Sequence, residues 1–97
     1  MLSASQKKQL KRLAAGEIST AQIGKDGFSE NTIKHILNMI DQKELIRIKI
    51  RNEELNAKNV ANKLHDEHNF EILRVIGGVI IAYKESESLP REKRIRF

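Results

Sequence analysis

The stretch QIGKDGFSENTIKHI, residues 22–36, decides the fold, because the spacing of its hydrophobic residues changes across two glycines. The segment STAQI, residues 19–23, is a short candidate strand that runs into Gly24. From Ser29 onward the aliphatic residues recur at i, i+3, i+4 and i+7, which is the spacing of a helix. They are Ile33, Ile36, Leu37 and Ile40. An Asp-Gly pair often marks a β-hairpin, but the helical period here predicts a strand-to-helix loop.

The segment before this loop, LSASQKKQLKRLAAG at residues 2–16, reads as a helix. Ser3 and Gln6 have the spacing of a capping box, and Gly16 can close the carboxyl end. Four cations and no acid lie on the faces away from its leucines: Lys7, Lys8, Lys11 and Arg12. Solvation and RNA contact explain these cations equally well.

The segment after the loop begins with ELIRIKIR, residues 44–51, which alternates strictly and predicts a strand covered on one side. Three isoleucines occupy one face, and the other face carries Arg47, Lys49 and Arg51. NAKNVANKLHDEHN, residues 56–69, has a helical stripe of small and aliphatic residues and an asparagine at either end for capping.

Two apolar runs follow, FEILRVI at residues 70–76 and VIIAYK at 79–84, separated by Gly77-Gly78. Two glycines are what a two-residue hairpin turn requires, so these strands should be antiparallel. The predicted order is α-β-α-β-α-β-β, a two-layer α/β domain over residues 1–84 with a four-stranded mixed sheet. Right-handed crossovers should place the helices starting near Ser29 and Asn56 on the same side of it. Residues 85–97 predict a mobile tail with a basic end, unless RNA or a partner orders it.

Composition narrows the class of protein. At 97 residues and with no cysteine, the chain fits one small domain held together by hydrophobic burial. No apolar run resembles a signal sequence or a membrane span, so we expect a cytoplasmic protein and no membrane partner. Residues 1–51 hold ten Lys/Arg against five Asp/Glu, residues 52–88 four against seven, and residues 89–97 four against one. This asymmetry favours a basic face for nucleic acid.

The sequence gives little support for a catalytic or metal-binding site. His65 and His68 share a helix face, but no third ligand accompanies them at a recognisable spacing, so a structural role is the better interpretation. No activated serine or cysteine is visible, and GKDGFS lacks the spacing of a P-loop. We therefore expect no enzyme, no cofactor, no metal site and no small-molecule substrate.

The GKDG loop has a different chemistry, because it needs only bare backbone and a cation. Gly24 and Gly27 lack the Cβ atoms that would hold a sugar-phosphate chain away. The helix beginning near Ser29 offers free amides to an anion, with Lys25 inside the loop and Lys34 within the helix. Asp26 would shape the turn. The loop resembles that by which KH-type modules hold a nucleic-acid backbone.

Recognition by base stacking on strand aromatics is not expected. The sequence has four aromatic residues, and no predicted strand presents the exposed pair on which an RRM stacks bases.

Two further interpretations remain open, a protein-interaction module and a DNA-binding domain. A protein-interaction module could dock through the edge hairpin or the basic tail. A winged-helix DNA-binding arrangement, with residues 70–84 as the wing, is weaker because its recognition helix would carry Asp66 and Glu67.

Three motifs in order, QIGKDGFSENTIKHI, KELIRIKI and VIGGVIIAYK, resemble the CRM (chloroplast RNA splicing and ribosome maturation) domain in its stand-alone YhbY-like form. The likeness covers residues 2–84, and the tail segment LPREKRI is similar too. The resemblance implies an RNA-binding domain with a KH-like GxxG loop and a fold similar to the C-terminal domain of translation initiation factor 3. It also implies association with large-subunit ribosomal precursors. The chain departs from the family in AAGEIST, which is not basic, and at Gly78, where a lysine or arginine is frequent.

We therefore expect a monomer that binds ribosomal RNA or precursor large subunits and assists ribosome maturation. The predicted RNA-binding residues are the loop, its neighbouring helix, and the cations of the first helix and the second strand. They are Gly24, Lys25, Asp26, Gly27, Lys34, Lys7, Lys8, Lys11, Arg12, Arg47, Lys49 and Arg51.

Overall fold

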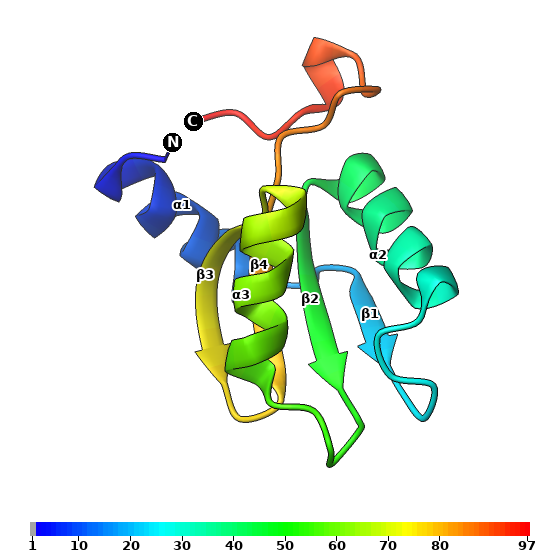
Figure 1. The fold of residues 1–97 in the computed structure, drawn as a ribbon. Coiled ribbons are helices and arrows are strands. Elements are labelled where there is room, and N and C mark those ends of the chain that lie inside the picture. The colour runs from blue at the N-terminus through cyan, green and yellow to red at the C-terminus, as the bar shows by residue number, and fades with distance from the viewer. Residues whose placement is uncertain (1) are drawn as a thin grey trace.

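The computed structural model describes residues 2–97 and has the predicted α/β architecture (Figure 1). Its helices and strands follow the predicted order and are joined by short connections. They are α1 (Ala4–Ala14), β1 (Thr20–Ile23), α2 (Glu30–Lys43), β2 (Leu45–Ile50), α3 (Ala57–His68), β3 (Glu71–Ile76), β4 (Val79–Tyr83) and a short 3-10 turn at Arg91–Lys93. Within residues 2–97, no helix has the length and apolarity needed to cross a bilayer.

The four strands form one mixed sheet in the order β1-β2-β4-β3. β1 pairs with β2 in parallel, and β4 pairs antiparallel with both β2 and β3. The turn of the last hairpin consists of Gly77 and Gly78, and Gly77 has a φ of +56°, which favours glycine. The mixed sheet and its hairpin are therefore as predicted.

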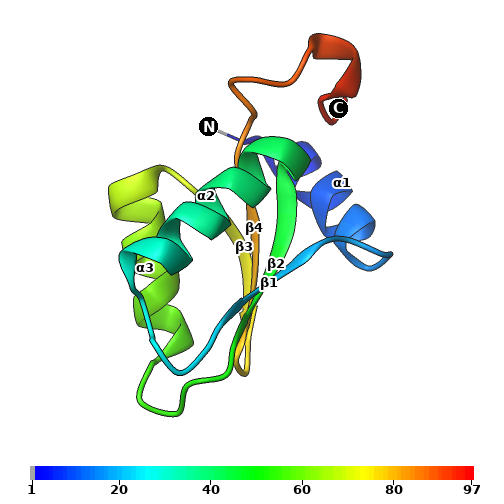
Figure 2. The same cartoon turned by 90° about the vertical axis from the view of Figure 1, so that its right-hand side faces the viewer.

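One face of the sheet, here called the inner face, is covered by both α2 and α3 (Figure 2). Its core is aliphatic except for Phe70, and joins Ile36 and Ile40 of α2 to Leu64 of α3 through strand residues such as Ile46. Ser29 and Asn56 cap the two helices through side-chain bonds to amides of their first turns. Both crossover helices lie on the same side, as the right-handed rule predicts.

The opposite face, here called the outer face, is covered by α1 at one end only (Figure 2). Leu10 and Ala14 of the helix pack on Leu45, Leu73 and Tyr83 of the sheet. A capping box of Ser3 and Gln6 begins α1, as predicted. The sequence left the position of this helix open, and in the structure it leaves the other half of the outer face exposed.

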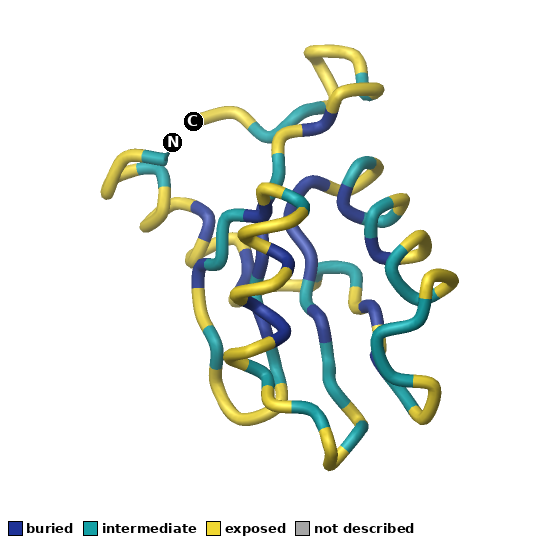
Figure 3. The backbone as a smooth tube through the Cα atoms, viewed as in Figure 1, coloured by how far each residue is buried: buried dark blue, intermediate teal, exposed yellow. Residues whose placement is uncertain are grey.

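The segment after β4 makes contacts that the prediction of a mobile tail did not include. Glu44 is 1% exposed, and its carboxylate accepts bonds from the amides of Ser86 (2.7 Å) and Ile95 (2.5 Å). Asp41 accepts bonds from the Ser86 hydroxyl (3.1 Å) and the Glu87 amide (3.0 Å). The tail is therefore tied to the end of α2 by two carboxylates of the chain itself. Its remaining residues are mostly exposed (Figure 3).

Candidate nucleic-acid interface

The GKDG loop joins β1 to α2 at the lower end of the sheet (Figure 1). It is a tight turn, in which the Gly27 amide donates to the Gly24 carbonyl at 3.0 Å. Gly27 has a φ of +64°, so glycine is required there by conformation. Gly24 has no such requirement, but a Cβ built on it would meet nothing within 4 Å. The backbone at Gly24 is therefore open to a ligand.

The loop is braced by the β2–α3 connection beside it. The Asn52 side chain donates to the Gly24 carbonyl at 3.2 Å and accepts a bond from the Glu54 amide at 2.9 Å. The Arg51 amide donates to the Ile23 carbonyl at 2.8 Å, at the point where β1 ends. These bonds hold the position of the turn without using the outward side of Gly24.

The start of α2 completes this end of the molecule. The Ser29 hydroxyl accepts a bond from the Thr32 amide at 3.3 Å, which leaves the first two helical amides, those of Glu30 and Asn31, with no intrahelical acceptor. Phe28 is half-buried against the core, and the Lys63 Nζ lies 5.2 Å from its ring centroid. The loop is thus anchored at its carboxyl end by packing and capping together.

Charges of both signs surround the loop, and the acids contributed by the β2–α3 connection were not predicted from the sequence. Lys25 and Arg51 line a shallow cavity of about 350 Å³ together with Asn52, Glu53 and Glu54. Lys25 and Asp26 are exposed at the tip, and Lys34 is exposed on α2. The ion pairs within residues 2–97 are Lys63–Glu67 and Arg94–Glu85, so the cations at the loop are unpaired in this part of the chain. They remain available to phosphate, but the surface is not uniformly basic.

The structure divides the twelve predicted RNA-binding residues into two groups. One group lies at the loop end and contains Gly24, Lys25, Asp26, Gly27, Lys34 and Arg51. The second group lies on α1 and the outer face and contains Lys7, Lys8, Lys11, Arg12, Arg47 and Lys49. The Arg47 guanidinium also donates to the Ala14 carbonyl at 3.2 Å and so caps the end of α1. Whether each of these residues contacts RNA stays a prediction.

Two residues near these groups were missed by the sequence analysis. Asn52 directly follows a strand, where an asparagine can satisfy a neighbouring backbone, and this position was its only signal. Arg74 lies on β3 amid apolar residues, and only the strand register shows which face carries it. Neither assignment was possible before the pairing of the strands was known.

His65, one of the two histidines of α3, has structural surroundings. The His65 Nδ1 lies 2.9 Å from the Phe70 carbonyl at the end of α3, which accounts for its position. No cluster of three or more metal-ligating side chains is found in the part of the chain that the structure describes.

Comparisons with known proteins agree with this fold. The model of the CRS1/YhbY (CRM) domain family matches residues 2–84. "Probable RNA-binding protein YqeI" of Bacillus subtilis is 33% identical over 88 residues, which cover 90% of this chain and 92% of that protein. An "RNA-binding protein" of Haemophilus influenzae is 29% identical over 96 residues, covering 94% of this chain and 97% of that protein.

A solved structure is also similar. The solution structure of the hypothetical protein SAV1595 of Staphylococcus aureus, described as a candidate RNA-binding protein, has a TM-score of 0.71 and 36% sequence identity. It covers 91% of this chain and 93% of that one. The match over nearly the whole sequence, together with the shared fold, shows that the chain belongs to the CRS1/YhbY (CRM) domain family.

Proposed function

We propose that this protein binds RNA and that the GKDG loop holds the RNA backbone during maturation of the large ribosomal subunit. Relatives named as RNA-binding proteins support the partner class. The ribosomal part of the proposal comes from the family resemblance. The observation that carries the site is the open backbone at Gly24, beside an exposed lysine and a capped helix.

The proposed mode is backbone recognition. A phosphate at the loop would lie near the free amides of Glu30 and Asn31, where the helix potential favours an anion. Lys25 and Lys34 would supply charge to the same phosphate chain. Asp26 and Glu30 repel phosphate, so we expect only a small number of backbone contacts here and a correspondingly modest salt dependence.

Titration of a large-subunit ribosomal RNA transcript over several salt concentrations tests the site. The variant Lys25→Ala with Lys34→Ala should weaken binding and make the salt dependence shallower, by about one unit of slope for each phosphate that the protein no longer neutralises. The matched control is Lys43→Ala with Lys93→Ala, which removes the same charge from exposed positions remote from the loop. If both pairs behaved alike, net charge rather than the loop would govern binding.

Sedimentation of a cell extract tests the ribosomal part separately. The protein should travel with precursors of the large subunit and leave them when the loop lysines are replaced. Sedimentation with no ribosomal particle, while purified protein still binds RNA, would reject the ribosomal role and retain RNA binding.

A further inference from the structure

The open half of the outer face shows an ordered pattern when the strand register is followed across the sheet. One row runs across the four neighbouring strands of the sheet and contains Thr20, Arg47, Ile81 and Arg74. The next row contains Gln22, Lys49, Val79 and Ile76. Side chains alternate between faces along a strand, and the neighbouring alternate positions fill the inner core, so both rows point outward. Together they contain three cations and three aliphatic residues but no acid.

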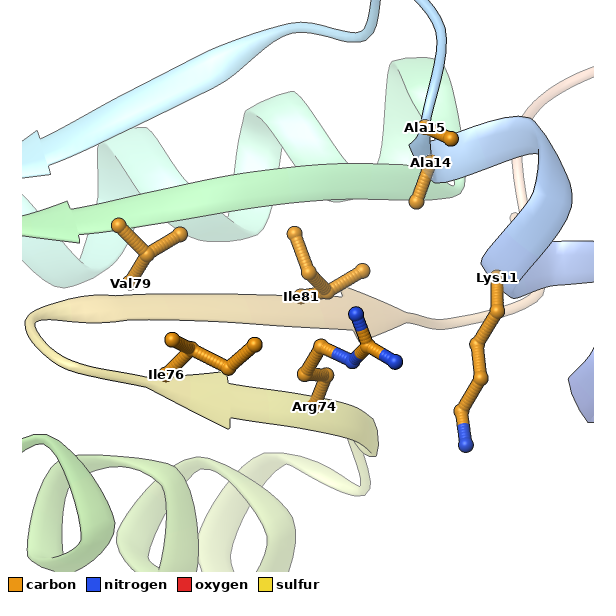
Figure 4. Close-up of a pocket in the computed structure, with 7 residues that line it drawn as sticks. All are labelled: Lys11, Ala14, Ala15, Arg74, Ile76, Val79 and Ile81. Atoms are coloured by element: carbon orange, nitrogen blue, oxygen red, sulfur yellow. The ribbon is translucent and has the colours of Figure 1, made fainter.

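The aliphatic residues of these rows form the floor of a cavity. Ile76, Val79 and Ile81 line a hollow of about 210 Å³ against the end of α1 (Figure 4). Ala14 and Ala15 close it on the helix side. Ile76 is 60% exposed, although it belongs to a strand with a packed inner face. The sheet therefore presents an apolar recess that its own helices do not fill.

Cations border the recess on both sides. Lys11 of α1 and Arg74 of β3 line it directly, and Arg47 and Lys49 occupy the adjoining strand. Lys7 precedes Lys11 by one helical turn and so lies on the same flank of α1. The lining contains no carboxylate. An apolar floor bordered by cations alone fits a ligand that is flat and apolar and carries negative charge beside it.

A nucleobase attached to its phosphate has this chemistry. An acidic peptide would satisfy the same charges, but the relatives are named for RNA binding, and the proposed function already assigns RNA to this chain. RNA-binding proteins also stack bases on the guanidinium plane of arginine, which Arg74 supplies here in place of an aromatic residue. We propose that this recess is a nucleobase subsite, formed by Ile76, Val79 and Ile81 with Arg74 and Lys11 at its rim.

This inference rests on the proposed function, because the base would belong to the same RNA that the GKDG loop holds. Lys49 connects the two surfaces, since it lies in the outer row and also borders the hollow beside Arg51 and Gly78. Arg47 and Ile50 are three positions apart along β2, or about 10 Å at the usual rise of a strand, and neighbouring strands lie about 4.8 Å apart. A single strand of RNA can therefore run from the loop end, past Lys49, to the recess.

The test is the double variant Ile76→Thr with Val79→Thr, titrated against the large-subunit ribosomal RNA transcript over several salt concentrations. Both substitutions keep a β-branched side chain and change no charge. Affinity should fall about tenfold, near the lower end of the effect of removing a stacked base, and the salt slope should not change. Arg74→Lys, which keeps the charge but removes the guanidinium plane, should give a smaller loss, again with an unchanged slope. Leu13→Ala, at a residue 49% exposed on another flank of α1, is the control and should leave affinity unchanged.

Photo-crosslinking gives an independent measurement on the same transcript with 4-thiouridine incorporated. Wild-type protein should carry nucleobase adducts within residues 71–84, and the double variant should lose them while thermal unfolding shows that it remains folded. Adducts elsewhere only, or unchanged affinity of the double variant, would overturn the subsite and leave the loop proposal standing. Failure of the wild-type protein to bind the transcript would instead reject the proposed function. If the double variant lost binding to an acidic protein partner while its RNA binding stayed intact, the recess would be assigned to protein and the inference overturned.

Discussion

Each end of the sheet has a polar side chain that fixes a neighbouring segment, Glu44 at the upper end and Asn52 at the lower end, and these two clamps differ in kind. At the upper end Glu44 is buried and its carboxylate accepts bonds from the amides of Ser86 and Ile95, which ties the tail to the end of α2. At the lower end Asn52 is partly exposed and its neutral amide binds the Gly24 carbonyl. The upper clamp uses a buried carboxylate whose two oxygens are both occupied by amides of the tail. The lower clamp leaves the outward backbone of the loop free.

This difference distinguishes a polar group that stabilises the fold from one that positions a binding loop. A buried carboxylate must be satisfied by donors, so its surroundings are fixed and little is left for a ligand. A half-exposed amide that braces one carbonyl positions a loop without closing it. We therefore expect substitutions at the upper end to change the stability of the whole domain, and substitutions at the lower end to change RNA binding or the local stability of the loop.

The largest effect on stability should follow Glu44→Gln. The substitution replaces one acceptor oxygen by a donor group that faces an amide, and bonds to charged groups contribute about 1.5–3 kcal/mol each. We expect a loss of about 2–3 kcal/mol in the free energy of unfolding by denaturant, with faster hydrogen exchange at Ser86 and Ile95. Glu87→Gln, which removes the same charge from an exposed side chain, should change stability little. Unchanged exchange at both amides would show that the upper clamp is not needed.

The next effect, on binding, should follow Gly24→Ala. Its Cβ meets nothing in the protein, and alanine restricts the unfolded chain, so stability should stay equal or rise by up to about 0.5 kcal/mol. RNA affinity should fall about tenfold, equivalent to ~1.4 kcal/mol, because the methyl group occupies the open side of the loop. Filter-binding titration and thermal unfolding measure the two quantities. Gly16→Ala, beyond the end of α1, is the control, and equal affinity of both variants would contradict backbone approach at Gly24.

A smaller effect should follow Asn52→Ala. Loss of the bonds to Gly24 and Glu54 should lower the free energy of unfolding by about 1 kcal/mol. Hydrogen exchange of the Gly27 amide should become faster, because its acceptor is the same Gly24 carbonyl. Asn38→Ala on the exposed face of α2 provides the comparison and should not affect that amide. A loop that exchanges as before would mean that its own turn is sufficient.

The smallest effect at neutral pH should follow Tyr83→Phe, at the upper end. Burial, followed by the negative charges of Glu44 and Glu85, raises the pKa of Tyr83 from 10.0 to about 12. Because the pKa is higher in the folded state, the neutral phenol contributes fully below about pH 10, and that contribution is lost as the pH rises toward 12. Wild-type stability should therefore fall across this interval, and the variant should lose this part of the decline. Unfolding midpoints measured from pH 8 to pH 11.5 make the comparison, and parallel curves would contradict it.

Much of the fold could be predicted from the sequence because its local signals agree. The spacing after Ser29, the strict alternation around Arg47 and the paired glycines at 77 and 78 each specify one local structure, and the order of these elements restricts the sheet. The loop residues could be located for the same reason. Arg74 and Asn52 could not, because their roles depend on which strands are neighbours.

The tail illustrates a second limit. Its serines and charges have no hydrophobic period, so they predict mobility and give no sign that Ser86 is buried and bonded to a glutamate 42 positions earlier. Glu44 itself reads as the first letter of an alternating strand. Its positive φ of 64° turns the chain out of α2 and directs its carboxylate to the tail. Contacts of such sequence separation leave no pattern within a local window.

The sequence by itself determined the elements, their order, the strand-to-helix loop and its bare glycine, because each of these depends on the conformation and spacing of a few adjacent residues. Only the tertiary structure decided that α1 covers half of the outer face, that acids stand beside the loop lysines, and that three aliphatic residues meet cations in an open recess. These features arise where strands far apart in the chain pair in a particular register. Pairing brings together side chains whose proximity no local pattern records.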